Sequence, residues 1–381
     1  MQNRGDNMIY LDYSATTPVD KRVLDTFNRV SLDFIGNPNS LHKLGVESKK
    51  LINQSIFQIK QILNVNDSEV IFTSGSSESN NLAIKGICDK YQNRGKHIIT
   101  TELEHSSIYG PLNYLSENGF EVDFVKLDQF GRVDIENLKQ LLREDAILVT
   151  ITAVNSELGI QQPITEIAEI LKEYPKCYFH VDATQAIGKI RINLDGIDLV
   201  SFSAHKFYGL KGIGCLIKKD KLVINSQING GKSTSVYRSG TPTVALDASL
   251  AKALRLAYEN IDEDTKYVDE LNKYLKKQLE KYENVYINSN KYSIPHILNL
   301  SIIGIKPETI LHALEEFEIY ISTQSACATG TSSKAVMALT NDVERANSSI
   351  RVSLSKMTTK EEINKFLEVF DKCYKKLLLK K

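Results

Sequence analysis

Seven short apolar runs, separated by stretches with helical periodicity, limit the folds open to this chain. The predicted strands are Val70–Thr73, His97–Thr100, Glu121–Lys126, Ala146–Thr152, Cys177–Val181, Leu199–Phe202 and Gly214–Ile217. Helices are predicted between the first five, at Ser77–Lys90, Ser107–Asn118, Ile135–Leu142 and Thr165–Lys172. This alternation is typical of an α/β domain with a mostly parallel sheet. Ligands bind at the carboxyl ends of such strands, so polar residues that follow a strand are candidates for a site.

The pattern changes after about residue 244. The predicted elements are a long helical stretch over Val244–Tyr282, strands at Ile297–Ile302 and Ser349–Ser353, a helix at Glu308–Phe317 and a last helix near Lys360–Leu379. This mixture indicates a smaller α+β domain. We therefore expect a large domain over residues 16–255 and a small domain formed by residues 1–15 and 256–381.

Composition narrows the classes of protein. With 381 residues, 42% of them hydrophobic, the chain can bury a large core and form two domains. Lys plus Arg equals Asp plus Glu, at 47 each, so no basic excess favours nucleic acid as a direct partner. The longest apolar-rich runs fall far short of the ~18 residues of a membrane helix, and the first residues show no secretory segment. We expect a cytoplasmic protein without a membrane partner or a metal site.

The five cysteines suggest one reactive thiol. Their odd number and the absence of a C-x-x-C pair fit reduced thiols better than a disulfide framework. Four of them, predicted in helices or strand-like runs, are interpreted as small hydrophobes or incidental thiols: Cys88, Cys177, Cys215 and Cys373. Cys327 differs, because it lies among small polar residues in STQSACATGTSSK, a pattern that predicts an exposed, mobile loop.

Two polar motifs directly follow predicted strands or end them. In FTSGSSESNN, backbone N–H groups at a helix start and the hydroxyls of Ser76 and Ser77 would bind an anion, although the same residues suit an ordinary N-cap box. In YFHVDATQAIG, Asp182 ends a strand and Gln185 follows three residues later. Asp182 either caps a loop or holds a proton on the ring nitrogen of a ligand.

Two further motifs add a histidine and a lysine. His105, in TELEHSS, follows a strand and is either an ordinary loop residue or part of a site. Lys206, in SFSAHKFYG, follows a strand and is flanked by Ser203 and His205. A lysine near a core is costly unless it is paired, neutral or covalently used. The alternative for Lys206 is a side chain that extends to solvent at a domain edge.

Together these motifs describe pyridoxal 5'-phosphate held as a Schiff base. The cofactor needs a lysine for its aldehyde, an acid at its pyridine nitrogen and an anion site for its phosphate. We assign Lys206 to the covalent bond with the aldehyde. The Asp182 carboxylate would keep the ring nitrogen protonated, so that the ring accepts the electrons of a carbanion.

The sequence resembles the class I cysteine desulfurases, pyridoxal-phosphate enzymes of the aminotransferase class V family, from Met8 to about Phe370. The motifs that carry the resemblance are YLDYSATTP, GNPNSLH, FTSGSSESNN, EHSS, NSELGIQQPI, HVDATQAIGK, SAHKFYGLKGIG, RSGT, QSAC and SSIRVSLS. The resemblance implies the transferase fold type I, with a mostly parallel seven-stranded sheet in the large domain. Because the family pattern starts at Met8, we expect residues 1–7 to form a flexible leader.

The resemblance implies a role for each residue at a matching position. Lys206 forms the internal aldimine, His105 stacks on the ring and takes part in proton transfer, and Cys327 is the nucleophile. Arg351 binds the substrate carboxylate, a bidentate task that suits a guanidinium, and Asn155 lies near the cofactor oxygen and the substrate. The other implied cofactor contacts are Asp182 at the pyridine nitrogen, Gln185 at the phenolic oxygen, Ser76, Ser77, Ser203 and His205 at the phosphate, and Thr241 from the partner subunit of a homodimer.

The implied reaction converts L-cysteine to L-alanine. Sulfur passes to a persulfide on Cys327 and then to an acceptor protein for tRNA thiolation, iron–sulfur cluster assembly or thiamine synthesis. One alternative is another fold-type I enzyme, such as a selenocysteine lyase or an aminotransferase-like enzyme, but transamination needs no thiol. The other is a non-catalytic protein that keeps the fold, and the presence of both Lys206 and Cys327 argues against it.

Two segments depart from the family pattern. NGGKSTSVYRSGT lacks the usual histidine before Gly-Gly and the usual Glu-Arg-Gly run, near the expected dimer and acceptor surface. In TQSAC, Gln324 replaces a glycine, which should stiffen the loop. These departures favour a dedicated tRNA-thiolation enzyme or a similar protein as the acceptor.

Overall fold

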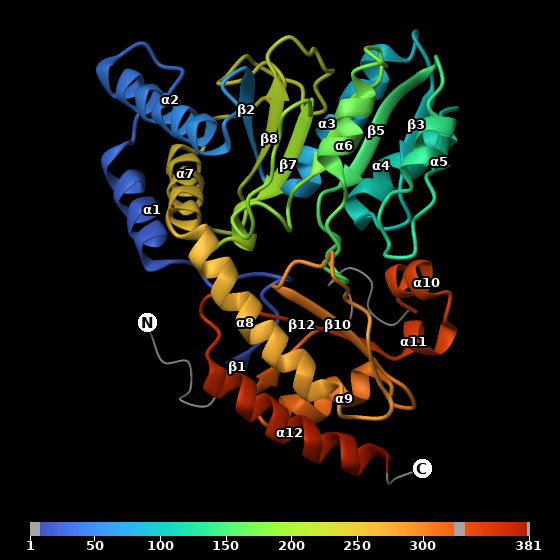
Figure 1. The fold of residues 1–381 in the computed structure, drawn as a ribbon. Coiled ribbons are helices and arrows are strands. Elements are labelled where there is room, and N and C mark those ends of the chain that lie inside the picture. The colour runs from blue at the N-terminus through green and yellow to red at the C-terminus, as the bar shows by residue number, and fades with distance from the viewer. Residues whose placement is uncertain (1–7, 324–331, 379–381) are drawn as a thin grey trace.

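The computed structural model describes residues 8–323 and 332–378, which surround two main sheets (Figure 1). A seven-stranded sheet organises the upper part of Figure 1, and a three-stranded sheet organises the lower part. The large sheet lies between two hydrophobic clusters, and the small sheet packs in a third. The expected α/β region and smaller α+β region are both present. The domain boundaries at residues 15/16 and 255/256 remain a prediction.

The large sheet contains every strand predicted for it. Its strands are β2 (Ser68–Thr73), β3 (His97–Thr100), β4 (Glu121–Phe124), β5 (Ala146–Thr152), β6 (Tyr178–Asp182), β7 (Leu199–Ser203) and β8 (Gly214–Lys219). Their order is β2-β8-β7-β6-β5-β3-β4. The pairs from β7 to β4 are parallel, whereas β8 runs antiparallel to both β7 and β2. The prediction of a mostly parallel seven-stranded sheet is therefore confirmed.

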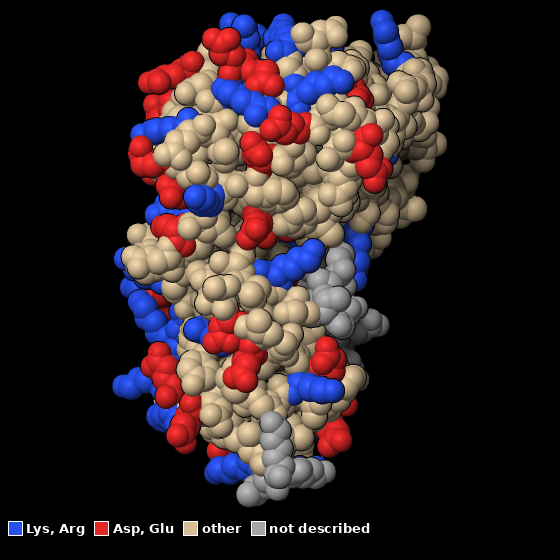
Figure 2. Space-filling view, turned by 90° about the vertical axis from the view of Figure 1, so that its right-hand side faces the viewer, with Lys and Arg blue, Asp and Glu red and all other residues tan. Residues whose placement is uncertain are grey.

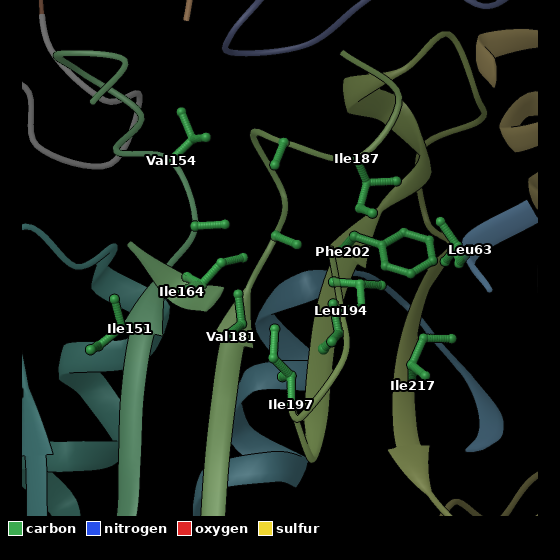
Figure 3. Packing of buried hydrophobic residues seen from close by; sticks show 14 of the residues in the cluster. Leu63, Ile151, Val154, Ile164, Val181, Ile187, Leu194, Ile197, Phe202 and Ile217 are labelled. Atoms are coloured by element: carbon green, nitrogen blue, oxygen red, sulfur yellow. The ribbon is translucent and has the colours of Figure 1, made fainter. Parts of the chain in front are cut away.

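Helices cover both faces of this sheet because neighbouring strand residues are apolar on both sides. The helices involved are α3 (Ser76–Tyr91), α4 (Ser106–Glu117), α5 (Ile135–Leu141), α6 (Ile164–Leu171) and α7 (Val244–Glu259). Leu216 packs in a cluster with side chains of α3 and α4. The next residue, Ile217, packs in the opposite cluster with α5, α6 and α7, where Val181 and Phe202 also lie (Figure 3). Burial on both faces is what a parallel sheet requires.

The long stretch predicted over 244–282 is helical, as expected, but it consists of two helices. α7 ends at Glu259 and α8 (Ile261–Leu279) begins after Asn260, whose φ of −131° and ψ of 30° are not helical. Asparagine is a weak helix former because its side chain competes for backbone hydrogen bonds. The break lets α7 pack in the large core while α8 packs in the core of the small region (Figure 1).

The small region has an antiparallel sheet with a helical layer. Its elements are β1 (Ile9–Tyr10), β9 (Val285–Ile287), β10 (Ile297–Ile302), β11 (Ile319–Tyr320), β12 (Ser349–Ser353), α9 (Pro307–Glu315), α10 (Lys334–Thr340), α11 (Val343–Asn347) and α12 (Lys360–Leu378). The sheet order is β12-β10-β9, and β1 pairs with β11 in a separate parallel pair. Leu300, Val352 and Phe366 are fully buried between this sheet and its helices.

Two N-terminal helices were not predicted. They are α1 (Lys21–Asp33) and α2 (Lys43–Leu63), and both pack against α7 (Figure 1). In α1 only Val23 and Val30 are buried. Large apolar side chains nearby remain exposed, including Leu32 at 77%, Ile35 at 76% and Leu41 at 97%.

The surface charges are mixed in sign, and the cysteines of the described residues are free thiols. On the face shown in Figure 2, Lys and Arg are interspersed with Asp and Glu. Among the helices that the structure describes, none combines the length and apolar character needed to cross a membrane. Cys88, Cys177, Cys215 and Cys373 are all buried free thiols, as predicted, although Cys177 precedes β6 rather than lying in it.

Candidate active site

A cavity of about 580 Å³ opens where β6 and β7 end and α3 begins. The predicted site residues on its wall are Ser76, Ser77, His105, Asp182, Gln185, Ser203, His205, Lys206 and Arg351. Residues of the N-terminal segment, among them Ser14 and Ala15, complete the wall. The fold therefore brings together side chains that are spread over most of the sequence.

Lys206 is held at this cavity by the N-terminal segment. It ends a short 3₁₀ helix, η1 (Ala204–Lys206), directly after β7. Its Nζ donates to the carbonyl oxygen of Ser14 at 2.7 Å and of Ala15 at 2.8 Å. Tyr208 has a φ of 64°, in the left-handed region, and its N–H donates to Thr17 Oγ1 at 2.7 Å. The chain turn that carries the lysine is thus fixed by residues some 190 positions earlier.

A turn with hydroxyl and backbone N–H groups lies at the start of α3. Ser203 Oγ accepts from the N–H of Ser76 at 2.7 Å and donates to Ser76 Oγ at 3.0 Å. The N-cap residue is Gly75, which has no side chain to cap the helix, so the N-cap box expected from Ser76 or Ser77 does not form there. The turn sits tightly on β8: a Cβ on Gly214 would lie 2.6 Å from Gly75 Cα. N–H groups and hydroxyls at a helix start suit a phosphate.

Asp182 ends β6 with its carboxylate buried and held from two sides. The side chain of Asn80, on α3, donates to Oδ2 at 2.8 Å, and the N–H of Thr184 donates to Oδ1 at 3.0 Å. Asp182 is only 4% exposed. Such a carboxylate is preorganised to face a positive or protonated group in the cavity.

His105 is the N-cap of α4, and its tautomer follows from its contacts. Nδ1 accepts from the N–H of Ser107 at 3.1 Å, so the proton of the neutral ring lies on Nε2. Burial lowers the pKa of His105. The charge of Lys206 also lowers this pKa, whereas the Asp182 carboxylate raises it. The imidazole is therefore neutral at pH 7 and can stack on an aromatic ring.

His205 and Gln185 complete the cavity wall beside Lys206. Burial, reinforced by Lys206, lowers the pKa of His205 to about 4, so this ring is also neutral. Gln185 is 5% exposed, and its Nε2 donates to the Ser14 carbonyl at 3.0 Å. Its Oε1 accepts from Lys189 Nζ.

Arg351, on β12, places a buried guanidinium at the cavity. It is 1% exposed, Nη2 donates to Asp12 Oδ1 at 2.8 Å, and Nη1 donates to the Ser156 carbonyl at 2.8 Å. Within the described part of the chain, Nε has no hydrogen-bond partner. The guanidinium is thus fixed in orientation and retains donor capacity for an anionic ligand.

Two predicted residues, Asn155 and Thr241, are not on this wall. Asn155 is buried, and its amide bonds to the backbone, donating to the Leu103 carbonyl at 2.9 Å and accepting from the Leu158 N–H at 2.7 Å. Thr241 is exposed and lies outside the cavity. Cys327 lies outside the described residues, so its role as nucleophile stays a prediction.

Three residues of the quoted motifs support the cavity wall from behind, and sequence reasoning passed over them. Asn80 donates to Asp182, Lys189 donates to Gln185, and Glu104 precedes His105. Glu104 Oε1 accepts from Thr101 Oγ1 at 2.7 Å. Burial raises the pKa of Glu104 to about 8, and the negative charge of Asp182 adds to the effect. Their positions within the quoted motifs were the only available signal, because their partners are distant in sequence.

Comparisons with known proteins identify relatives over nearly the whole chain. Residues 9–366 match the Aminotransferase class-V family. A protein named cysteine desulfurase IscS from Dictyoglomus turgidum is 38% identical over 97% of this chain and 95% of its own length. A NifS/IcsS protein homolog from Lactobacillus delbrueckii subsp. bulgaricus is 40% identical over 96% and 97%. A solved NifS-like protein has a TM-score of 0.91 and 34% identity, covering 98% of this chain and 100% of that one.

The chain therefore belongs to the aminotransferase class-V family, a family of enzymes. Within it, the chain groups with the cysteine desulfurases of the IscS and NifS type, as the motifs predicted. The solved SspA in complex with cysteine also shares the fold, with a TM-score of 0.81 and 30% identity over 92% of this chain and 100% of that one. The roles of the individual site residues remain predictions.

Proposed function

We propose that this protein is a pyridoxal-phosphate-dependent cysteine desulfurase that converts L-cysteine to L-alanine and takes up the sulfur on Cys327. One observation carries the proposal: the Lys206 amine, the buried Asp182 carboxylate and the Arg351 guanidinium lie on the wall of one cavity. An amine for the aldehyde, an acid for the ring nitrogen and a cation for the substrate carboxylate are the groups that this chemistry requires.

The residues present fit the cofactor chemically. Ser76 and Ser203, at the start of α3, suit its phosphate. The neutral ring of His105 suits stacking, and Asp182 suits a proton held on the pyridine nitrogen. When bound, pyridoxal phosphate supplies an aldehyde that bonds to an amine and a ring that stores the electron pair of a carbanion.

The chain's own groups would bind the substrate and move its proton. Arg351 would bind the substrate carboxylate through its remaining N–H donors, with Asp12 and the Ser156 carbonyl holding the guanidinium in place. Lys206 Nζ, as a free amine, would take the proton from the substrate Cα. Asn155 would act indirectly on the substrate, by fixing the backbone at Leu103 and Leu158 next to the cavity.

Cys327 would perform the sulfur transfer. Its thiolate attacks the substrate sulfur, a new S–S bond forms on Cys327, and the substrate C–S bond breaks with its electron pair remaining on carbon. Protonation of that carbon leads to alanine, and the enzyme keeps a persulfide. The thiolate is the reactive form, whereas an ordinary thiol with a pKa of ~8.5 is only a few per cent ionised at pH 7.

The decisive experiment measures alanine and sulfide from L-cysteine with purified protein, added pyridoxal phosphate and a dithiol reductant, which reduces the enzyme persulfide and releases its sulfur as sulfide. Wild type should release both, and Cys327→Ser should keep the visible absorbance of bound cofactor but lose alanine formation. Cys88→Ser is the matched control, since Cys88 is buried. Near-normal alanine formation by Cys327→Ser would overturn the assignment of the nucleophile. A preference for selenocysteine without turnover of cysteine would identify a selenocysteine lyase, and no cofactor binding would indicate a non-catalytic protein.

The proposal extends to a homodimer. Thr241 is exposed and does not line the cavity of its own chain, which fits a contribution to the phosphate site of a partner subunit. The exposed Leu32, Ile35 and Leu41 near α1 and α2, together with Val236 at 62%, offer apolar surface for such a contact.

We further propose that the persulfide sulfur passes to an acceptor protein of tRNA thiolation, iron–sulfur cluster assembly or thiamine synthesis. The unusual segment around Lys232 supports a dedicated acceptor such as a tRNA-thiolation enzyme, because its sequence departs from the family pattern. A cytoplasmic location suits this chemistry, since thiols stay reduced there. Transfer of labelled sulfur to each class of purified acceptor would test the choice.

A further inference from the structure

A second lysine, Lys189, is buried beside the Lys206 site, and the proposed chemistry leaves it without a task. Lys189 is 7% exposed and follows β6 at the end of the HVDATQAIGK motif. Gly188, just before it, has a φ of 75°, and a Cβ there would lie 2.5 Å from Phe207 Cβ. The turn therefore requires glycine, and it directs the next residue into the interior.

The backbone of Lys189 is fixed from both sides. Its N–H donates to the Ala186 carbonyl at 3.0 Å, and its carbonyl accepts from Thr265 Oγ1, on α8, at 2.7 Å. Its position is thus determined by both the large and the small region, at the same junction where Lys206 is held.

The side chain of Lys189 has one polar contact and repulsive neighbours. Its Nζ donates to Gln185 Oε1, and within residues 8–323 and 332–378 no carboxylate forms an ion pair with it. The charged and titratable groups around it are Lys206 and Arg351 and, on a small cavity shared with Lys206, Tyr13, Tyr208, Asp264, His296 and Lys356. Burial lowers the pKa of Lys189, and the charges of Lys206 and Arg351 lower it further. A buried amine in such a place is costly to the fold, which suggests a role in the site.

We propose that Lys189 is a positioning residue that fixes the orientation of the Gln185 amide. An amide can place either its oxygen or its NH₂ group toward a given neighbour, and its partners decide which. Lys189 offers N–H donors to Oε1, so Nε2 must face the opposite side, where it meets the Ser14 carbonyl that also accepts from Lys206.

The consequence for the site is an N–H donor on the cavity wall that would be available to the phenolic oxygen of the cofactor, the contact that the family resemblance implies for Gln185. This step rests on the proposed function, because it assumes pyridoxal phosphate bound to Lys206. Nε2 of Gln185 has a second hydrogen besides the one given to Ser14, and it can donate to that oxygen. If Lys189 loses its donors, Oε1 of Gln185 is left buried without a hydrogen-bond partner. If the amide then flips, Oε1 would face the Ser14 carbonyl oxygen, and two acceptors would repel each other.

The experiment compares cofactor binding by the full-length variants Lys189→Met, which removes the donors, and Lys189→Arg, which retains them. Pyridoxal phosphate is titrated into each apoprotein, and the visible absorbance of the bound cofactor is then followed against pH. Lys189→Met should weaken binding about tenfold, the size expected for one buried hydrogen bond to a polar group. It should also shift the pH at which the absorbance changes, and Lys189→Arg should restore most of the loss.

A double-mutant cycle with Gln185→Ala separates positioning from a merely structural effect. If Lys189 acts through Gln185, Lys189→Met should cost nothing further in the Gln185→Ala background. Lys218→Met is the matched control, because Lys218 is also fully buried but bonds to Glu69 and to the carbonyls of Lys219 and Leu222. It should leave cofactor affinity and absorbance unchanged.

Two results would overturn the proposal: unchanged affinity and absorbance in Lys189→Met, or an equal loss in the wild-type and Gln185→Ala backgrounds. These are distinct from failure of the proposed function. A wild-type protein that binds no pyridoxal phosphate would overturn both, whereas wild-type binding with a silent Lys189→Met would overturn the role of Lys189 alone.

Discussion

At the scale of single residues, Arg351 has a guanidinium that is already held in one orientation at the cavity. Its guanidinium is buried and oriented by Asp12 and the Ser156 carbonyl. Arg351→Ala should raise KM for L-cysteine about 10–100-fold, because a hydrogen-bonded charge pair is lost and the Asp12 carboxylate is left facing the substrate carboxylate. Steady-state kinetics would measure this, with Arg143→Ala, at an exposed ion pair, as the control. Wild-type values of both KM and kcat/KM would remove Arg351 from substrate binding.

Glu104 makes a prediction about pH. Burial raises the pKa of its carboxyl to about 8, above the ordinary 4.5, so the folded protein binds a proton that the unfolded chain releases between these values. The stability that Glu104 contributes is therefore fully present below about 4.5 and is lost as the pH rises through about 8. In Glu104→Gln this pH dependence should be absent. Between pH 5 and pH 9 the melting temperature of wild type should therefore fall by a few degrees more than that of Glu104→Gln.

Thermal melting of the apoproteins at several pH values would measure this difference. The exposed neighbour Glu102 provides the matched control as Glu102→Gln, which should follow the wild-type curve. Parallel curves for wild type and Glu104→Gln would show that Glu104 is not protonated in the folded state near pH 7.

At the scale of elements, the start of α3 depends on its contact with β8. Gly214→Ala would place a Cβ 2.6 Å from Gly75 Cα, so the turn at Gly75 has to move. We expect a loss of about 1–3 kcal/mol in the free energy of unfolding and a clear loss of affinity for pyridoxal phosphate. Gly231→Ala is the control, since a Cβ there meets nothing within 4 Å. Unchanged cofactor affinity in Gly214→Ala would show that the turn does not bind the phosphate.

At the scale of the whole molecule, the proposed dimer should be visible in sizing experiments as twice the mass of one chain. A mixing test is sharper. Co-expressed Lys206→Ala and Thr241→Ala chains should recover activity, because one of the two sites then has an intact lysine and an intact Thr241 from its partner. Lys206→Ala mixed with Arg351→Ala should not, since both residues lie on one cavity of one chain. Recovery in the second mixture, or none in the first, would contradict the shared site.

The sequence by itself determined the succession of strands and helices along the chain from β2 to β8 and the chemistry at the strand ends. Apolar periodicity is a local property, so β5 was predicted to the residue. Polar residues at the ends of parallel strands, such as Asp182 and Lys206, had to meet at one edge of the sheet. The family followed from the motifs for the same reason, because each motif is a short local pattern.

Only the tertiary structure decided which distant groups pair. Asn80 reaches Asp182 across 102 positions, and Asp12 reaches Arg351 across 339. Such pairs depend on strand order and on how the two regions are joined, and neither leaves a periodic signal in the chain. The break at Asn260 has the same origin, because packing of α7 and α8 in different cores outweighs the helical pattern that runs through both. Lys189 becomes interpretable for this reason only in three dimensions, where its one polar contact lies beside Lys206.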